Sequence, residues 1–298
     1  MLGFLPGRLR GVLSFFLISL NTILIFIPIM IVALFKLVMP VPKIQDFCSR
    51  VLISIASKWV EFNAGIFRLM NRIKWKVIGG EDLKNNEWCL IISNHQSWVD
   101  IFVLQTILLH KVPYIKFFLK KELIWVPLMG LAWWALDFPF MKRYSAGFLK
   151  KHPHLKGKDV EITRKACEKF KVKPISIMNF MEGTRFTETK HRQQQSPFTS
   201  LLKPKAGGIA FVLGAMGDYL NSLLNITIAY PQGIGSFWDF LCGRITEIRV
   251  HIEKMAIPRE ILGDYDNDPE FRNFFQNWIN GLWVEKDLRI KHLLENES

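Results

Sequence analysis

The stretch Trp88–Asp100, WCLIISNHQSWVD, decides the fold class of this 298-residue chain. Its first six residues form a short apolar run, which is typical of a strand buried inside a sheet. The polar residues Asn94 to Ser97 follow at once, and the next apolar stretch, 98–109, has the length of a helix. A buried strand that leads into a helix through a polar turn indicates an α/β domain, in which ligand sites lie at the carboxyl ends of strands.

The alternation of strands and helices continues on both sides of this stretch. We expect strands at Lys74–Ile78, Ile175–Phe180, Leu224–Ala229 and 248–252, and helices at 158–171, 206–220 and beyond Asp268. Asp268 can cap the last helix, and Pro269 suits its first turn. The aromatic face of that helix either packs on the sheet or lies in a membrane interface.

The N-terminal part of the chain has the character of a membrane segment. Gly11–Phe35 is a run of 25 residues without a charge. A helix of this length reaches about 37 Å, enough to cross the ~30 Å hydrocarbon core of a bilayer. It is too long for a signal peptide, and Pro28 leaves open both a full span and a helix that enters one leaflet. Apolar residues then recur at helical spacing over 44–73.

We therefore expect residues 1–73 to form a two-helix membrane-attachment region and residues 74–298 to form the remaining domain. Lys and Arg number 39 and Asp and Glu 26, a net charge of +13, which favours an anionic partner such as nucleic acid, an anionic membrane or a phosphorylated substrate. No nucleic-acid-binding module accompanies this charge. The four Cys lie far apart without metal-ligand spacing, so we expect no metal site and a reducing compartment.

His95 and Asp100 give the strongest chemical signal. Five helical steps rotate by about 500°, so the two residues cannot share a helical face. They meet if His95 lies in the turn and Asp100 in the first helical turn. Asp100 would then orient the His95 ring, and His95 would accept a proton from a substrate hydroxyl. The alternatives are that Ser97-x-x-Asp100 only caps the helix, or that His95 has a structural role.

The segment Glu182–Arg185, EGTR, ends another apolar strand. Gly183 allows a tight turn and a close approach of the backbone to a ligand. Arg185 can bind a phosphate through two parallel hydrogen bonds, and Thr184 can donate to it. Glu182 would hold Arg185 or accept a substrate hydroxyl. The alternative is a surface turn with an ion pair.

A third segment, Phe138–Arg143, is predicted to be an apolar strand that ends in two cations, although a solvated strand end is an alternative. We expect all three segments to lie at strand ends of one sheet. Their order and spacing resemble those of the glycerolipid acyltransferases, the 1-acylglycerol-3-phosphate acyltransferases and their relatives. The likeness covers roughly residues 74–235 and includes Lys120–Leu123 and Lys205–Gly208. The segments FMKRYS and GKDVE especially resemble a bacterial inner-membrane member of that family.

The resemblance implies a mixed α/β sheet flanked by helices, and a membrane-bound enzyme that moves a fatty acyl group to the sn-2 hydroxyl of lysophosphatidic acid. It makes His95 the general base and Asp100 its orienting carboxylate. It assigns acceptor binding to Lys120, Arg143, Glu182, Gly183, Thr184 and Arg185. The segment 224–231 would border the acyl-donor site.

The donor implied is an acyl thioester, either acyl-CoA or acyl carrier protein, so no cofactor and no metal are expected. The expected partners are the phospholipid bilayer, a lysophospholipid acceptor and that donor, without nucleic acid. The expected location is the bacterial inner membrane, with the catalytic domain on the cytoplasmic side. Phe-Met-Lys before Arg143 departs from the commoner Ile-Asp form of the family, which leaves another lysophospholipid headgroup open. A non-catalytic, basic, membrane-anchored lipid-binding protein is the alternative of a different class.

Overall fold

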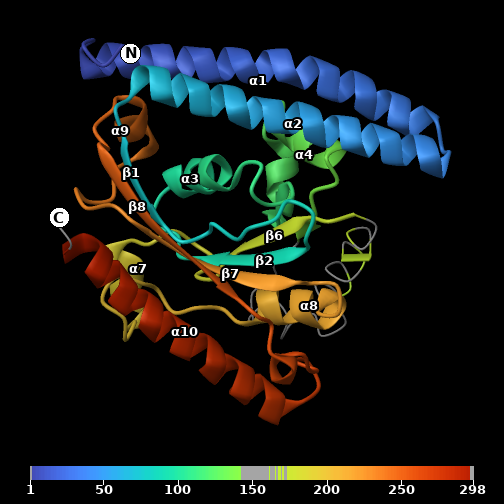
Figure 1. Ribbon diagram of the computed structural model, residues 1–298, viewed down its shortest axis with the longest axis vertical. Coiled ribbons are helices and arrows are strands. Elements are labelled where there is room, and N and C mark those ends of the chain that lie inside the picture. The colour runs from blue at the N-terminus through green and yellow to red at the C-terminus, as the bar shows by residue number, and fades with distance from the viewer. Residues whose placement is uncertain are drawn as a thin grey trace.

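The computed structural model describes residues 2–141, 161, 165, 167–168, 170 and 173–295. In this part of the chain two long helices precede a domain in which strands and helices alternate (Figure 1). The elements before residue 142 are α1 (Gly7–Val38), α2 (Pro42–Met70), β1 (Lys74–Ile78), β2 (Cys89–Ser93), α3 (Val99–Leu108), β3 (Ile115–Phe117), β4 (Leu119–Lys120), η1 (Lys121–Trp125), α4 (Met129–Ala135) and β5 (Phe140–Met141). Those after it are β6 (Ser176–Phe180), α7 (Glu188–Gln194), α8 (Gly207–Met216), β7 (Ser222–Ala229), α9 (Phe237–Leu241), β8 (Glu247–Met255), η3 (Arg259–Ile261) and α10 (Pro269–Glu295).

The main sheet has six strands in the order β1-β8-β7-β2-β6-β3. Strand β2 runs parallel to both of its neighbours, β6 and β7, while β7 and β8 pair antiparallel. The predicted mixed sheet flanked by helices is therefore confirmed. Ser93, the last residue of β2, lies in register with Phe180, the last residue of β6. The polar segments that follow these two strands consequently emerge side by side at one edge of the sheet.

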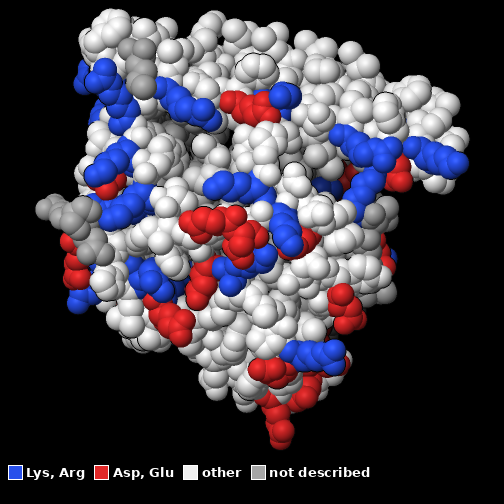
Figure 2. All heavy atoms as spheres, viewed as in Figure 1, with Lys and Arg blue, Asp and Glu red and all other residues white. Residues whose placement is uncertain are grey.

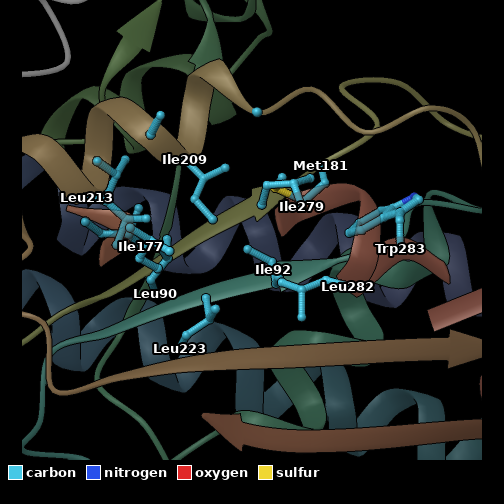
Figure 3. Close-up of a cluster of buried hydrophobic side chains, with 14 of the residues drawn as sticks. Leu90, Ile92, Ile177, Met181, Ile209, Leu213, Leu223, Ile279, Leu282 and Trp283 are labelled. Carbon is cyan, nitrogen blue, oxygen red and sulfur yellow. The ribbon is translucent and has the colours of Figure 1, made fainter. Parts of the chain in front are cut away.

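Helices cover both faces of this sheet, because β2 is apolar on both sides and fully buried. Figure 3 shows one face, where side chains of the sheet pack against those of α8 and α10. Asp268 caps α10 as predicted, with Oδ1 accepting from the backbone N–H of Glu270 and Phe271 at 2.9 and 3.0 Å. Phe275 and Trp283 of α10 are buried in this core, so the helix packs on the sheet as one of the two alternatives predicted.

Helices α1 and α2 lie together across the opposite side of the domain (Figure 1). In the described part of the chain, α1 is the helix long and apolar enough to cross a membrane, and 11% of its most apolar window is buried. Polar contacts join the two helices, including Asn21 Nδ2 to Asn63 Oδ1 at 2.8 Å. Asn71, which ends α2, donates through Nδ2 to the carbonyl of Phe240 in α9 at 3.1 Å. The helix pair is thus packed and hydrogen-bonded onto the domain.

The structure corrects the prediction for the segment Phe138–Arg143. Its strand β5 pairs with β4 in a separate two-stranded sheet, so this segment does not end a strand of the main sheet. Pro139 has no N–H to donate to a sheet ladder, which limits the pairing here to a short stretch. Arg143 lies outside the described residues, as does most of the predicted helix 158–171.

Candidate active site

His95 lies in the loop after β2, and Asp100 is the second residue of α3, as predicted from their spacing. The loop is held in place by Asn94, whose side chain continues the sheet. Its Nδ2 donates to the carbonyl of Ile228 and its Oδ1 accepts the N–H of the same residue, both at 2.9 Å. Asn94 was not singled out in the sequence, because nothing there shows that it reaches β7.

Asp100 is fully buried and accepts hydrogen bonds on both of its carboxylate oxygens. Oδ2 lies 2.8 Å from Nδ1 of His95 and accepts the backbone N–H of Gln96 and Ser97 at 2.6 and 2.8 Å. Oδ1 accepts the hydroxyl of Tyr230 at 2.6 Å. Asp100 therefore stabilises the start of α3 and also orients the imidazole. Because the carboxylate requires a proton on Nδ1, the unprotonated nitrogen left for a substrate is Nε2.

Packing fixes the plane of the His95 ring. The ring stacks on Phe180 with centroids 3.9 Å apart and an interplanar angle of 13°. The backbone carbonyl of His95 accepts the N–H of Phe186 at 2.8 Å, and its own N–H donates to Oε1 of Glu182 at 3.1 Å. Contacts with the end of β6 and with the turn after it thus fix the position of His95.

Glu182 is a buried structural link, and it does not pair with Arg185. Its second oxygen, Oε2, accepts the N–H of Leu202 at 3.3 Å, so the carboxyl group joins the β2 loop to the segment before α8. The expectation that Glu182 holds Arg185 is therefore wrong. Arg185 instead lies over the ring of Trp98, with Cζ 4.4 Å from the ring centroid.

Cationic side chains surround the turn 182–185. Lys190 donates through Nζ to Thr184 Oγ1 at 2.8 Å and to the carbonyl of Arg185 at 2.9 Å. Gly183 has φ +66°, and the side chain of Lys205 lies against it, so that a Cβ there would meet Lys205 at 3.2 Å. Arg185, Lys190 and Lys205 consequently offer positive charge around one small turn, a suitable arrangement for a phosphate group. Lys190 was missed because its spacing from the EGTR motif carries no signal by itself.

A cavity of about 860 Å³ connects this turn with the helix pair. The polar part of its wall includes His95, Lys120, Gly183, Thr184, Arg185 and Lys205. The rest is mainly apolar and comes from α1, α2, α3 and α4, including Ile25, Phe26, Ile29, Ala56, Phe102, Ala132 and Trp133. The volume lies within the ~300–1,000 Å³ of ligand-binding pockets. The cavity has room for a ligand with a charged head and a long apolar tail.

Two buried ionisable groups lie near the sheet beneath the site. Burial raises the pKa of Glu182 to about 8, and the charge of Asp100 raises it further. The hydrogen bonds that Glu182 accepts and the charge of Lys286 act in the opposite direction. Burial lowers the pKa of Lys286 to about 7. Lys286 comes from α10 and donates to the carbonyl of Ile226 in β7 at 2.6 Å. The aromatic pattern of α10 gave no indication that a lysine of that helix is buried.

We expect Glu182→Gln to flatten the pH dependence of unfolding. The pKa of Glu182 is about 8 in the folded state, against about 4.3 for an unfolded chain. At a pH between these two pKa values, the carboxyl group of Glu182 is protonated in the folded protein and ionised in the unfolded chain. The contribution of Glu182 to stability is therefore complete below about pH 4.3 and is lost as the pH rises through about 8, by at most about 1.4 kcal/mol per pH unit.

The measurement is the melting temperature of the detergent-solubilised protein from pH 5 to pH 9. Glu188→Gln on the exposed surface of α7 is the matched control, and it should follow the wild-type curve. Parallel curves for the wild type and Glu182→Gln would contradict the raised pKa.

Comparison with known proteins shows what the domain that carries this site is similar to. Residues 74–216 match the family model described as Acyltransferase. The chain is 25% identical over 256 residues to lysocardiolipin acyltransferase 1 of Danio rerio, which covers 81% of this chain and 61% of the relative. It is 21% identical over 230 residues to 1-acyl-sn-glycerol-3-phosphate acyltransferase epsilon of Mus musculus, which covers 70% of this chain and 58% of the relative. Residues 74–216 are thus similar to the Acyltransferase family, and both of these curated relatives are acyltransferases by name.

The fold of the α/β domain and the helix pair together is similar to a solved structure. The crystal structure of the 1-acyl-sn-glycerophosphate (LPA) acyltransferase PlsC from Thermotoga maritima aligns with a TM-score of 0.53 and 17% sequence identity, covering 94% of this chain and 98% of that chain. The two curated relatives above are longer, and this chain spans about three-fifths of their length. The comparisons thus show a likeness to acyltransferases and a similar fold, and the activity of this chain is considered next.

Proposed function

We propose that this acyltransferase moves a fatty acyl group from an acyl thioester, acyl-CoA or acyl carrier protein, to the sn-2 hydroxyl of lysophosphatidic acid. The product would be phosphatidic acid. The observation that carries the proposal is the contact of Asp100 Oδ2 with His95 Nδ1 at 2.8 Å, in a cavity that also contains Arg185. One cavity thereby offers a base for a hydroxyl, a cation for a phosphate and apolar space for an acyl chain.

The reaction follows from these positions. Nε2 of His95 takes the proton of the acceptor hydroxyl while its oxygen attacks the thioester carbonyl. The tetrahedral intermediate collapses, the carbon–sulfur bond breaks, and the departing thiolate receives the proton from His95. Asp100 stabilises the imidazolium between these steps, as the carboxylate does in a catalytic triad. The donor is already activated, so the step as written needs no metal and no other cofactor.

The acceptor phosphate would bind at the turn after β6. Gly183, Thr184 and Arg185, with Lys120 at the same cavity, surround this position, and Lys190 and Lys205 add charge beside the turn. Glu182 would contribute indirectly, by accepting the backbone N–H of His95 and so positioning that residue. Arg143, which the family resemblance also implies, is kept as part of this proposal.

We expect Arg185→Ala to raise the KM for lysophosphatidic acid by about 10- to 100-fold, with a smaller effect on kcat. A hydrogen bond to a charged group is worth about 1.5–3 kcal/mol, and Arg185 can make two to a phosphate. Steady-state kinetics with varied acceptor measure the change. Arg192→Ala, which removes the same charge from an exposed position of α7, is the matched control. An unchanged acceptor KM in Arg185→Ala would contradict phosphate binding at this residue.

A second acceptor is favoured by one specific observation. The relative from Danio rerio is named a lysocardiolipin acyltransferase. The headgroup of lysocardiolipin is larger than that of lysophosphatidic acid. The basic turn suits any lysophospholipid with a phosphodiester or phosphate. Lysocardiolipin or another lysophospholipid is therefore the alternative acceptor for the same mechanism.

The exposed surface of α1 supports a lipid substrate. The surface along α1 is largely uncharged in Figure 2, with Lys and Arg towards its two ends. Phe15, Phe16, Ile23, Leu24, Ile27, Ile31 and Leu34 of α1 are exposed large apolar side chains. Contiguous apolar patches of this kind mark membrane or partner surfaces. We propose that α1 and α2 attach the enzyme to the inner membrane of a bacterium, with the basic catalytic domain on the cytoplasmic face, where anionic lipids attract Lys and Arg.

The test is a substrate screen on purified protein in detergent. Labelled acyl-CoA or acyl carrier protein would be offered with lysophosphatidic acid, other lysophospholipids and lysocardiolipin, with His95→Ala as the control. Transfer to lysophosphatidic acid that depends on His95 is the expected result. Transfer only to another lysolipid would replace the acceptor and keep the mechanism. No transfer from either donor would favour a membrane-anchored lipid-binding protein instead.

A further inference from the structure

The hydrogen bond between Tyr230 and Asp100 joins the carboxyl end of β7 to the candidate dyad of His95 and Asp100. Tyr230 directly follows β7 and is 4% exposed. Its hydroxyl donates to Oδ1 of Asp100 at 2.6 Å, while the other three hydrogen bonds of Asp100 are made by Oδ2. Among the described residues, Tyr230 is the hydrogen-bond donor to Oδ1. The segment 224–231 was expected to border the acyl donor, and its tyrosine contacts the carboxylate of Asp100.

We propose that Tyr230 is a positioning residue that sets the basicity and the orientation of the His95 imidazole through Asp100. This inference rests on the proposed function. The hydroxyl holds Oδ1 and thereby fixes the rotation of the carboxylate, so that Oδ2 faces the imidazole. It also draws negative charge from the carboxylate by a hydrogen bond to its ionised form. A carboxylate with less free charge stabilises the imidazolium less, and His95 therefore gives up its proton to the leaving group more readily.

Loss of the Tyr230 hydroxyl is expected to strengthen the effect of the Asp100 charge on His95. Without it, Oδ1 is a buried acceptor with no donor, and the carboxylate gains freedom to rotate. More of its charge then acts on His95 and stabilises the imidazolium relative to the neutral base.

The other charged groups near Asp100 come from the elements packed around it. Glu182 follows β6 and bonds to the backbone of His95, and Lys286 of α10 lies beneath β7 and acts on Glu182. Arg185 lies over Trp98, the residue just before α3. All of these stay in place when only the hydroxyl of Tyr230 is removed, so the variant isolates one hydrogen bond.

The experiment compares Tyr230→Phe with Tyr265→Phe across a pH series, using the full-length protein in detergent. Tyr265 packs against Phe275 of α10, in the core formed with α8, and serves as the matched control. In Tyr230→Phe we expect kcat to fall about tenfold, which is about 1.4 kcal/mol, with both KM values within about twofold of the wild type. The acidic limb of the kcat/KM profile should move to higher pH by about half a unit or more.

A second measurement does not depend on catalysis. Diethyl pyrocarbonate modifies neutral imidazole, and peptide mass spectrometry of the modified protein gives the titration of His95 alone. This titration should also move to higher pH in Tyr230→Phe and stay in place in Tyr265→Phe. If the wild type transfers no acyl group to any acceptor, the proposed function fails, while this titration still tests the link between Tyr230 and His95.

A third variant covers the case in which Tyr230→Phe does not fold. Incorporation of 3-fluorotyrosine at residue 230 keeps the ring and makes the hydroxyl a stronger donor, so the titration of His95 should move to lower pH. The proposal is overturned if the acidic limb and the His95 titration stay at their wild-type positions in these variants. It is also overturned if Tyr230→Phe loses activity only in proportion to a lower melting temperature.

Discussion

His95→Ala is expected to lower the rate of acyl transfer by about 10²- to 10⁴-fold, the usual contribution of a positioned general base. The acceptor hydroxyl is a weak nucleophile, and Nε2 of His95 is the proposed acceptor of its proton. The cationic turn and the apolar cavity remain in the variant, so the KM for the acceptor should change little. Initial rates with a labelled acyl donor measure the loss.

The variant should keep its fold and its place in the membrane fraction. The His95 side chain contacts Asp100 of α3 and stacks on Phe180 of β6, and both of these elements are held by other contacts in its absence. His110→Ala is the matched control, because His110 is an exposed histidine that pairs with Glu61 away from the cavity. A well-folded His95→Ala enzyme with wild-type activity would refute the general-base role.

Ala132→Phe is expected to shift the chain-length preference of the enzyme towards shorter donors. Ala132 lies in α4, is buried and lines the apolar part of the cavity. A phenyl group that displaces about four methylenes of the acyl chain would remove about 3 kcal/mol of apolar burial. That corresponds to about a 100-fold loss of kcat/KM for long donors, with little loss for short ones.

Competition between donors of different chain length measures this preference. Ala132→Val should give a smaller shift in the same direction. Leu131→Phe is the matched control on the same helix, because Leu131 is exposed and does not line the cavity. An unchanged preference in Ala132→Phe, with an unchanged melting temperature, would place the acyl chain elsewhere.

The parts of the site that depend on local sequence were predictable. An apolar strand followed at once by polar residues identified the ends of β2 and β6, and the rule that ligands bind at carboxyl ends of strands brought His95 and the EGTR turn together. The five-residue spacing to Asp100 was also informative, because the two side chains can meet when His95 lies in the turn and Asp100 in the first turn of α3.

The parts that depend on long-range packing were not predictable. Tyr230 and Lys286 reach the site from segments more than a hundred residues away, and a tyrosine after a strand or a lysine in a helix has no distinctive pattern. Arg249 of β8 shows the same limit, because it alternates in the sequence with the apolar residues Ile248 and Val250, a pattern that is typical of a half-exposed strand. The structure buries it, with hydrogen bonds to Glu247 and to the carbonyl of Leu293 at the end of α10.

The shared wall of the cavity has a consequence for how this enzyme can be altered. Ile25 and Ile29 of α1 and Ala56 and Trp59 of α2 line the same cavity as His95. The helix pair therefore forms part of the wall of the proposed active-site cavity, and we expect that another membrane anchor could not replace it. We expect removal of the two helices to open this cavity to water, and foreign helices in their place would have to reproduce this inner surface as well as the length of α1.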